Sequence, residues 1–180
     1  MPDIMQILAD DHANMRALMQ LLETEVDKMA DGGQADVDMI SAVAAYLLEY
    51  PDRFHHPVED LLIQGMQAAG AVPGSSVEAL ETEHTRISGL AGELHDAAVA
   101  IAAEQPMRRD AFVECARRYI TALRRHMDIE DTDFFPRAEE VLSAEDRAAI
   151  TARLPDLEDP LFGVATRDRY RALSDALLAQ

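Results

Sequence analysis

At 180 residues the chain is long enough to bury one hydrophobic core, and nothing in it indicates two unrelated domains. Its formal net charge of −18 repels phosphate backbones and anionic lipids, so nucleic acids and membranes are poor candidate partners. Aromatic residues make up only 5% of the chain, while Ala, Leu, Glu, Asp, Arg and Met are plentiful, which favours an all-α fold over a β-rich one.

The expected location is the cytoplasm. A single cysteine, Cys115, excludes an intramolecular disulfide and gives no indication of an oxidising compartment. The amino-terminal MPDIMQILAD carries acids where a signal peptide has a basic region. No apolar run approaches the roughly 20 residues that span a bilayer.

Two long amphipathic helices are predicted in the first half of the chain. Asp3 is a plausible N-cap for the first helix, whose apolar stripe recurs at steps of three and four over residues 5–29 and ends at two glycines. The second helical pattern runs over about residues 36–69. Pro51 and Pro57 are expected to kink or split it.

Two further helices are predicted in the second half. Ser75 with Glu78 makes a capping box for the third helix. Pro106 suits the first turn of the fourth, which ends near Pro136 or Glu140. Because short links join the four helices, we expect an up-down-up-down antiparallel four-helix bundle.

Additional short C-terminal helices are expected outside the bundle. A capping box at Ser143 and Asp146 begins one, and residues 161–178 form another helical piece. We therefore predict a bundle over residues 1–140 and a C-terminal helical extension over residues 141–180 that packs on it.

Each apolar stripe has a gap, and histidines and glutamates fill all four gaps: His12 in the first helix, His55 and Glu59 in the second, His84 in the third, and His126 and Glu130 in the fourth. Both His-x-x-x-Glu pairs place their side chains on one helix face, one turn apart. With a rise of about 1.5 Å per residue and alternating helix directions, all six residues fall in one layer roughly 15 Å from one end of the bundle.

These residues predict a metal site. A buried carboxylate without a partner is costly, and two that face each other repel, whereas cations remove both penalties. A lone histidine on an apolar face is more often a core residue, but four at one level with two glutamates favour metal over a purely structural bundle. Two bridging carboxylates with two imidazoles on each metal leave positions for a bridging oxygen and an exogenous ligand. Such an open pair indicates iron before manganese or zinc.

The stretches FHHPVEDLLI and HMDIEDTDFFP, with DDH in the first helix and EH in the third, resemble the HHE cation-binding family of hemerythrin-like proteins over about residues 5–137. DPLFG at residues 159–163 also resembles the tail of bacterial members. The resemblance implies a non-haem di-iron centre, with bridging glutamates and these ligands: His12, His55, Glu59, His84, His126 and Glu130. Family members often carry His or Glu after the first helix-2 histidine, so His56 is a further candidate. If Pro57 kinks the helix, His56 reaches the rim of the site as a ligand; otherwise it is an outer or solvated residue.

The sequence departs from oxygen-carrying hemerythrins at two points. Those proteins end the last motif with a longer spacing to Asp and have a second histidine one turn from the third-helix ligand; here the motif ends in Glu130, and Ser88 occupies that position. Reversible oxygen carriage is therefore not implied. The expected function is a di-iron protein that binds or reacts with oxygen, peroxide or nitric oxide, as a sensor, scavenger or carrier.

Other functions rank lower. A di-iron oxidase or peroxidase is one alternative, and a relative of the stress proteins that repair iron–sulfur clusters is another. Those repair proteins usually carry an additional Cys-containing amino-terminal segment, which is not found here. A ferritin-like carboxylate protein needs two Glu-x-x-His motifs, and only Glu81 with His84 matches one.

The remaining polar residues have simpler interpretations. His95 is expected on the flank of its helix and Tyr119 in the core. Three acids beside the ligands are either solvated or acceptors for imidazole N–H groups: Asp11, Asp60 and Glu83. Six arginines scatter around the fourth helix and are expected to form a solvated face: Arg108, Arg109, Arg117, Arg118, Arg124 and Arg125.

Overall fold

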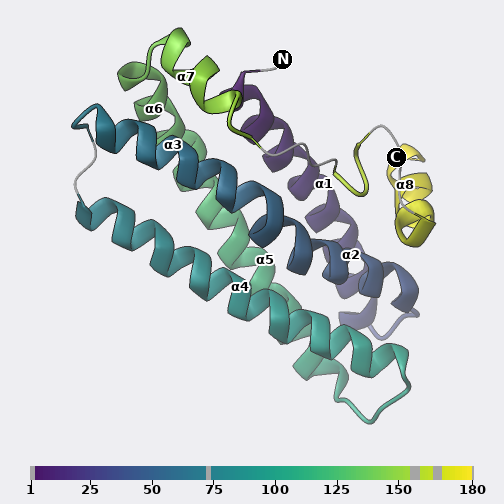
Figure 1. The fold of residues 1–180 in the computed structure, drawn as a ribbon. Helices are drawn as coiled ribbons and strands as arrows, with labels where there is room; N and C mark the ends of the chain where they lie inside the picture. The colour runs from purple at the N-terminus through teal and green to yellow at the C-terminus, as the bar shows by residue number, and fades with distance from the viewer. Residues whose placement is uncertain (1–2, 72–73, 155–158, 164–167, 180) are drawn as a thin grey trace.

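A computed structural model describes residues 3–71, 74–154, 159–163 and 168–179, and the regular structure in these ranges is all helical, as predicted. Four long rods make up the bundle (Figure 1). They are α1 (Ile4–Ala30); α2 (Val37–Tyr50), continued by the π-helical turn η1 (Pro51–His55) and α3 (His56–Ala68); α4 (Gly74–Ala102); and α5 (Arg109–Ile129), continued by the π-helical turn η2 (Glu130–Phe134) and α6 (Phe135–Val141).

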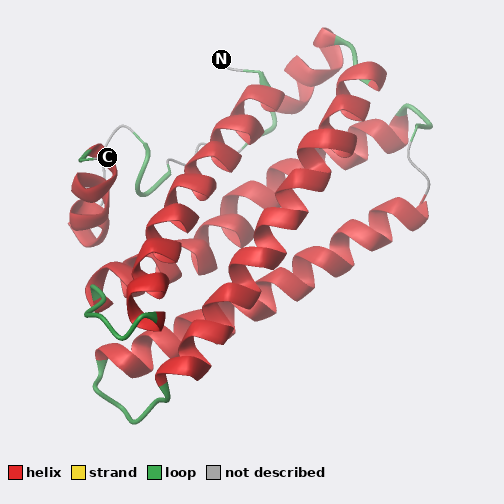
Figure 2. Cartoon of the chain, turned by 180° about the vertical axis from the view of Figure 1, so that it is seen from behind, coloured by secondary structure: helices red, strands yellow, loops and turns green. Residues whose placement is uncertain are grey.

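Each rod packs against the rods that precede and follow it in the sequence. The main helix contacts join α1 to α2, α2 to α4, α4 to α5 and α5 back to α1. The view from behind shows the same alternation of directions, with short loops at the ends of the rods (Figure 2). This is the up-down-up-down bundle that the short links predicted.

The helix starts agree only in part with the capping signals. Asp3 caps α1 by accepting a hydrogen bond from the Met5 N–H at 3.0 Å, as predicted. α4 begins at Gly74, one residue before the expected cap Ser75, and the side chains of residues 72–77 lie outside the described part of the chain. The placement of Pro106 in a first helical turn is wrong. Glu104 takes a positive φ of 53°, which turns the chain out of α4 into a loop, so α5 begins only at Arg109.

A proline follows each π-helical turn by two residues. The His56 N–H donates to the Pro51 carbonyl, and the Phe135 N–H donates to the Glu130 carbonyl, each five residues back. Pro57 and Pro136 lack the N–H that a regular α-helix would use next, and the wider turn accommodates the interruption. The helix predicted to kink or split near Pro51 and Pro57 is therefore interrupted there, but by a π turn within a continuous rod.

Two apolar clusters fill the bundle, one on each side of the histidine layer. The larger lies toward the α1–α2 and α4–α5 loops and includes Met15, Leu47 and Tyr119. The smaller includes Leu8 and Leu62. Between them, at the level of His12 on α1, the chain places its buried histidines together with Glu59 and Glu130.

The C-terminal residues pack on the outside of the bundle. α7 (Ala144–Thr151) contacts α1 and α3, and its Ile150 joins the smaller apolar cluster. Ser143 forms the predicted capping box with Asp146. A 3-10 turn (Asp168–Tyr170) leads into α8 (Arg171–Leu178), which lies against α2 (Figure 1). The division at residue 140 falls in the last turn of α6 and stays a prediction.

None of the described helices has the length and apolar character that crossing a membrane requires.

Candidate metal centre

The structure brings all seven predicted ligands together in the centre of the bundle, and all seven are buried. Every rod contributes: His12 from α1, His55 from the end of η1, His56 and Glu59 from α3, His84 from α4, His126 from α5, and Glu130 from the start of η2. The layer predicted from residue spacing is therefore found, although ligation of a metal by these residues stays a prediction.

The ligand atoms form two groups, within each of which all atoms lie within 4.8 Å of one another. The first group holds His56, Glu59, His84 and His126, and the second holds His12, His55, Glu59 and Glu130. Glu59 belongs to both. The sequence suggested two histidines for each metal, but the inclusion of His56 makes the division three and two.

Both glutamates divide their oxygens between the two groups. Glu59 Oε1 lies 3.3 Å from His55 Nε2, and Glu59 Oε2 lies 3.3 Å from His84 Nε2. Glu130 Oε2 lies 3.3 Å from His12 Nε2, and Glu130 Oε1 lies 3.0 Å from His126 Nε2. Each carboxylate therefore spans the gap between the groups, which is the arrangement of a bridging ligand.

The imidazoles turn their nitrogens toward the same interior points. His12 Nε2 and His55 Nε2 are 3.1 Å apart, close to the separation of two adjacent ligands on one ion. The rings of His56 and His84 stack with centroids 4.0 Å apart and planes 11° from parallel. His126 stands edge-on to His84 at 4.9 Å.

Several of these atoms have no hydrogen-bond partner, although they are buried: both carboxylate oxygens of Glu59 and of Glu130, and the Nε2 atoms of His84 and His126. Buried polar atoms in folded proteins are nearly always paired, and each exception requires an explanation. Carboxylate oxygens and imidazole nitrogens are also good ligands for divalent transition metals. The residues present therefore fit a metal centre.

Electrostatics hold the two carboxylates ionised. Burial raises the pKa of Glu130, but the surrounding imidazoles of His12, His126 and His84 outweigh it and hold that pKa well below its usual range. Burial also raises the pKa of Glu59, which the charge of His55 brings below its usual value, while Glu130 opposes this as a like charge. Two ionised carboxylates side by side favour cations between them.

The surroundings shift the pKa values of the histidines in opposite directions. Burial lowers the pKa of His55, but the charge of Glu59 and contact with Asp11 raise it to about 10. Burial likewise lowers the pKa of His84, and the carboxylates of Glu130 and Glu59 raise it to about 9. Burial and the neighbouring charge of His84 lower the pKa of His56 to about 4. A metal must therefore displace protons from His55 and His84, whereas His56 is neutral at pH 7.

Three aspartates orient the imidazole rings by pairing with Nδ1, the ring nitrogen on the side away from Nε2. Asp131 Oδ1 lies 2.8 Å from His12 Nδ1, Asp11 Oδ2 lies 3.2 Å from His55 Nδ1, and Asp52 Oδ1 lies 3.0 Å from His56 Nδ1. Each aspartate is held in turn by a further donor: Arg16 to Asp131, the Tyr50 hydroxyl to Asp11, and Ser88 to Asp52. An N–H of the ring donated to a carboxylate leaves the opposite nitrogen free for a metal.

Sequence reasoning identified only part of this outer set. Asp11 was a candidate acceptor and is one, whereas Asp60 and Glu83 are exposed, and neither accepts a hydrogen bond from a described ring of the centre. Asp52 and Asp131 were missed. Asp52 lies one helical turn before His56, and this spacing could have indicated that it contacts the His56 ring. Asp131 directly follows Glu130, and its position in the sequence gave no indication of a contact with His12.

Two other predicted residues stay outside the centre. The side chain of His95 is 32% exposed and belongs to neither ligand group, in agreement with its placement on a helix flank. Tyr119 is buried in the larger apolar cluster, and its hydroxyl donates to the Leu47 carbonyl at 3.4 Å. Tyr119 is a core residue, as expected.

Comparison with known proteins places this geometry in a family. A family model described as the hemerythrin HHE cation binding domain matches residues 3–138. Searches of curated proteins and of solved structures give no match. The matched range covers the first three rods, the fourth as far as residue 138, and every residue of both ligand groups, which together indicate a metal-binding protein. The chain therefore belongs to the hemerythrin HHE cation-binding domain family.

Proposed function

We propose that the chain binds two iron ions at this centre and there binds or reacts with oxygen, peroxide or nitric oxide, as a sensor, scavenger or carrier. The observation that carries the proposal is the position of Glu59 and Glu130, each with one oxygen toward each ligand group. A single ion would leave one oxygen of each buried carboxylate uncompensated. Two ions satisfy all four oxygens.

The ligand count supports an accessible position for a small molecule. The three-histidine group supplies three nitrogens and one oxygen from each glutamate, and the two-histidine group supplies one nitrogen fewer. His56, His84 and His126 would hold one ion and His12 and His55 the other, so the two-histidine group, with fewer protein ligands, would leave room for a small molecule. Iron bound in this way supplies one-electron redox chemistry and affinity for small oxygen and nitrogen ligands.

The residues around His12 and His55 enclose the place that a small molecule would take. His12 is locked by Asp131, and the Phe135 ring lies 5.1 Å from the His12 ring. On the other side of the pair, Asp11 holds His55 and is itself fixed by Tyr50. Apolar clusters above and below exclude bulk water, which favours small uncharged ligands over larger anionic ones.

The proposed partners are accordingly small molecules, and the net charge of −18 argues against nucleic acid and anionic membranes. The cytoplasmic location stays a prediction, supported by the single cysteine.

The first test is metal content per chain together with the ultraviolet–visible spectrum. The protein is loaded anaerobically with ferrous iron, freed of unbound metal, and measured before and after addition of oxygen, peroxide or nitric oxide. We expect about two irons per chain and an oxo-bridge-type band that changes with at least one of these molecules. Zinc-loaded protein is the control and stays colourless. One iron per chain, or a spectrum that none of the three changes, would contradict the proposal.

A further inference from the structure

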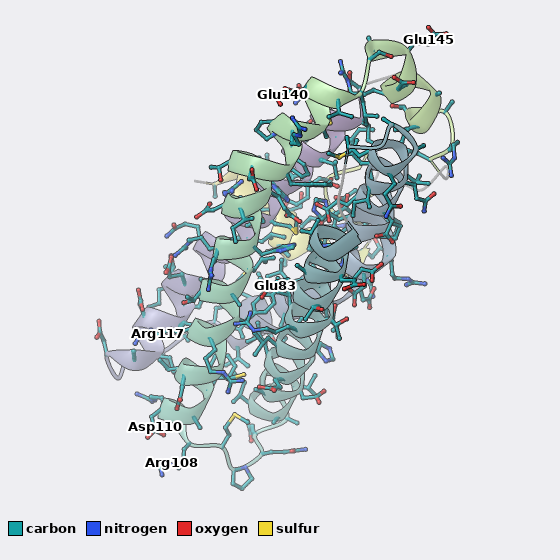
Figure 3. All side chains as sticks on the ribbon, turned by 90° about the vertical axis from the view of Figure 1, so that its left-hand side faces the viewer. Glu83, Arg108, Asp110, Arg117, Glu140 and Glu145 are labelled. Carbon is teal, nitrogen blue, oxygen red and sulfur yellow. The ribbon has the colours of Figure 1, made fainter. Side chains whose placement is uncertain are left out.

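A groove with a volume of about 1160 Å³ lies outside the metal centre, over α4 and α5. Six arginines line it: Arg86, Arg108, Arg109, Arg117, Arg118 and Arg125. Two acids, Asp110 and Glu114, also line it, so the lining keeps a net positive charge on a chain that has only 16 Lys and Arg residues against 34 Asp and Glu. Arg108 and Arg117 mark its lower part in Figure 3. The sequence predicted that six arginines of the fourth helix scatter over a solvated face. Five of those six line this groove, and only Arg124 does not.

The positive charge of the groove is only partly neutralised within the chain. Four of the six arginines pair with acids at 2.5–3.4 Å, and the side chains of these four are at least half exposed: Arg117 pairs with Asp27, Arg118 with Glu93, Arg86 with Glu83 and Arg108 with Asp110. Exposed pairs of this kind contribute little to stability, so the carboxylates of a bound partner can replace the acids in them. Arg109 and Arg125 make no ion pair with any described residue.

The shape of the groove fits a protein surface better than a small molecule. Leu90, Val113 and Ala122 contribute an apolar floor between the arginines. From Arg109 to Arg125 the groove follows α5 for about 24 Å, at about 1.5 Å per residue. A small ligand needs most of its surface enclosed, which this open groove does not provide. An apolar strip with a charged rim is instead typical of protein interfaces.

One end of the groove adjoins the metal centre. Arg86 follows His84 by two residues on α4, and Arg125 directly precedes His126 on α5. The side chains of His84 and His56 are 11% and 9% exposed, against 4% for His126 and about 1–2% for His12 and His55. A protein bound at this end of the groove lies beside the helix segments that carry His84 and His126, and these segments offer a short route for electrons.

We propose that this groove is the docking surface for an acidic one-electron carrier protein that reduces the metal centre. The inference rests on the proposed di-iron function. Two reduced carriers each lose one electron, and together they convert two ferric ions to ferrous. Acidic side chains of the carrier contact the arginines, and complementary charge accelerates an encounter that the net charge of −18 otherwise slows. The net charge of −18 also repels the phosphates of a nucleic acid, and a nucleic acid has no redox centre with which to reduce the iron.

The test follows reduction of the ferric, iron-loaded full chain by a reduced acidic plant-type [2Fe–2S] ferredoxin, in stopped flow at low and high salt. The variant Arg108→Glu/Arg109→Glu reverses charge at the end of the groove farthest from the ligands. Arg137→Glu/Arg153→Glu makes the same change in net charge on exposed residues outside the groove. Dithionite, a small reductant, reports whether each protein retains a reducible centre.

For wild type we expect a second-order rate constant that falls with added salt. At low salt this rate constant is about tenfold lower in Arg108→Glu/Arg109→Glu. It changes little in Arg137→Glu/Arg153→Glu. All three proteins react equally with dithionite. If both double variants lose the same rate, net charge and not the groove is responsible, and the docking proposal fails. Equal ferredoxin rates in all three proteins, or variant-sensitive binding of single-stranded DNA instead, would also overturn it. A centre that dithionite cannot reduce would overturn the di-iron function itself, and the electron-donor proposal with it.

Discussion

At the scale of single residues, the two glutamates hold the two ligand groups together. Glu59 and Glu130 are the only carboxylates of the described chain that belong to these groups, and each has an oxygen toward both. We predict that Glu59→Ala or Glu130→Ala loses most of the bound metal, because one substitution removes a ligand from each ion. Elemental analysis of loaded, desalted protein measures this loss.

The matched control is His95→Ala, which removes an imidazole from the neighbouring surface of α4 and should leave metal content unchanged. Two metals per chain in both glutamate variants would show that neither carboxylate bridges, and the dinuclear assignment would then rest on the histidines alone.

His56 is the residue that gives the first ligand group three histidines, whereas the second group has two. It is buried, stacked on His84 and held by Asp52, as expected of a terminal ligand. We predict that His56→Ala weakens one of the two metals, so that a chelator removes about one equivalent far more readily than from wild type. Ser88→Ala, which removes only the donor behind Asp52, is expected to change affinity by roughly tenfold at most. Equal chelator resistance in His56→Ala and wild type would make His56 an outer residue.

At the scale of the elements, the adjacent histidines depend on a local departure from α-helical geometry. Successive residues of a regular α-helix point about 100° apart, yet His55 and His56 each enter a ligand group. The π turn η1 ends at His55, and Pro57 follows without an N–H. The proline thus favours the backbone that lets both side chains point inward.

We predict that Pro57→Ala weakens metal binding several-fold. The new N–H makes a regular α-helix available to residues 51–59, and in that geometry His55 and His56 diverge. Pro106→Ala, in the exposed loop before α5, is the control and should bind metal as wild type does. Competition with a metal-binding dye compares the three proteins. Unchanged affinity in Pro57→Ala would show that packing around the centre, and not the proline, maintains the π turn.

Much of this arrangement was predictable from residue spacing. Four apolar stripes with gaps predicted the rods, and the positions of the gaps predicted one layer of ligands, because helix rise and direction are regular. Pro57 predicted an interruption but not its form, since a kink, a break and a π turn all follow from a missing N–H. Asp131 could not be recognised because its contact with His12 joins residues 119 positions apart, and no periodicity encodes such a pair.

At the scale of the whole molecule, the bundle contains a buried charged layer between two apolar clusters. Without metal, this layer is balanced by protons: His55 and His84 have raised pKa values, and Glu59 and Glu130 have lowered ones. Metal replaces those protons with its own charge, so the same residues stabilise the fold by different means in the two states. Stability as a function of pH distinguishes these states.

Raised histidine pKa values stabilise the metal-free fold below the unfolded pKa of about 6.5, and this contribution disappears as pH rises through the folded values of about 9 and 10. We therefore predict that metal-free protein loses on the order of 2 kcal/mol between about pH 7 and pH 10, or roughly 4–8 °C in melting temperature for a chain of this length. Zinc-loaded protein keeps its melting temperature over the same range, because its imidazoles are already neutral. Thermal unfolding followed by circular dichroism measures both forms, and the loaded protein controls for every other group that titrates. Parallel losses in the two forms would mean that these histidines are not protonated in the folded metal-free protein.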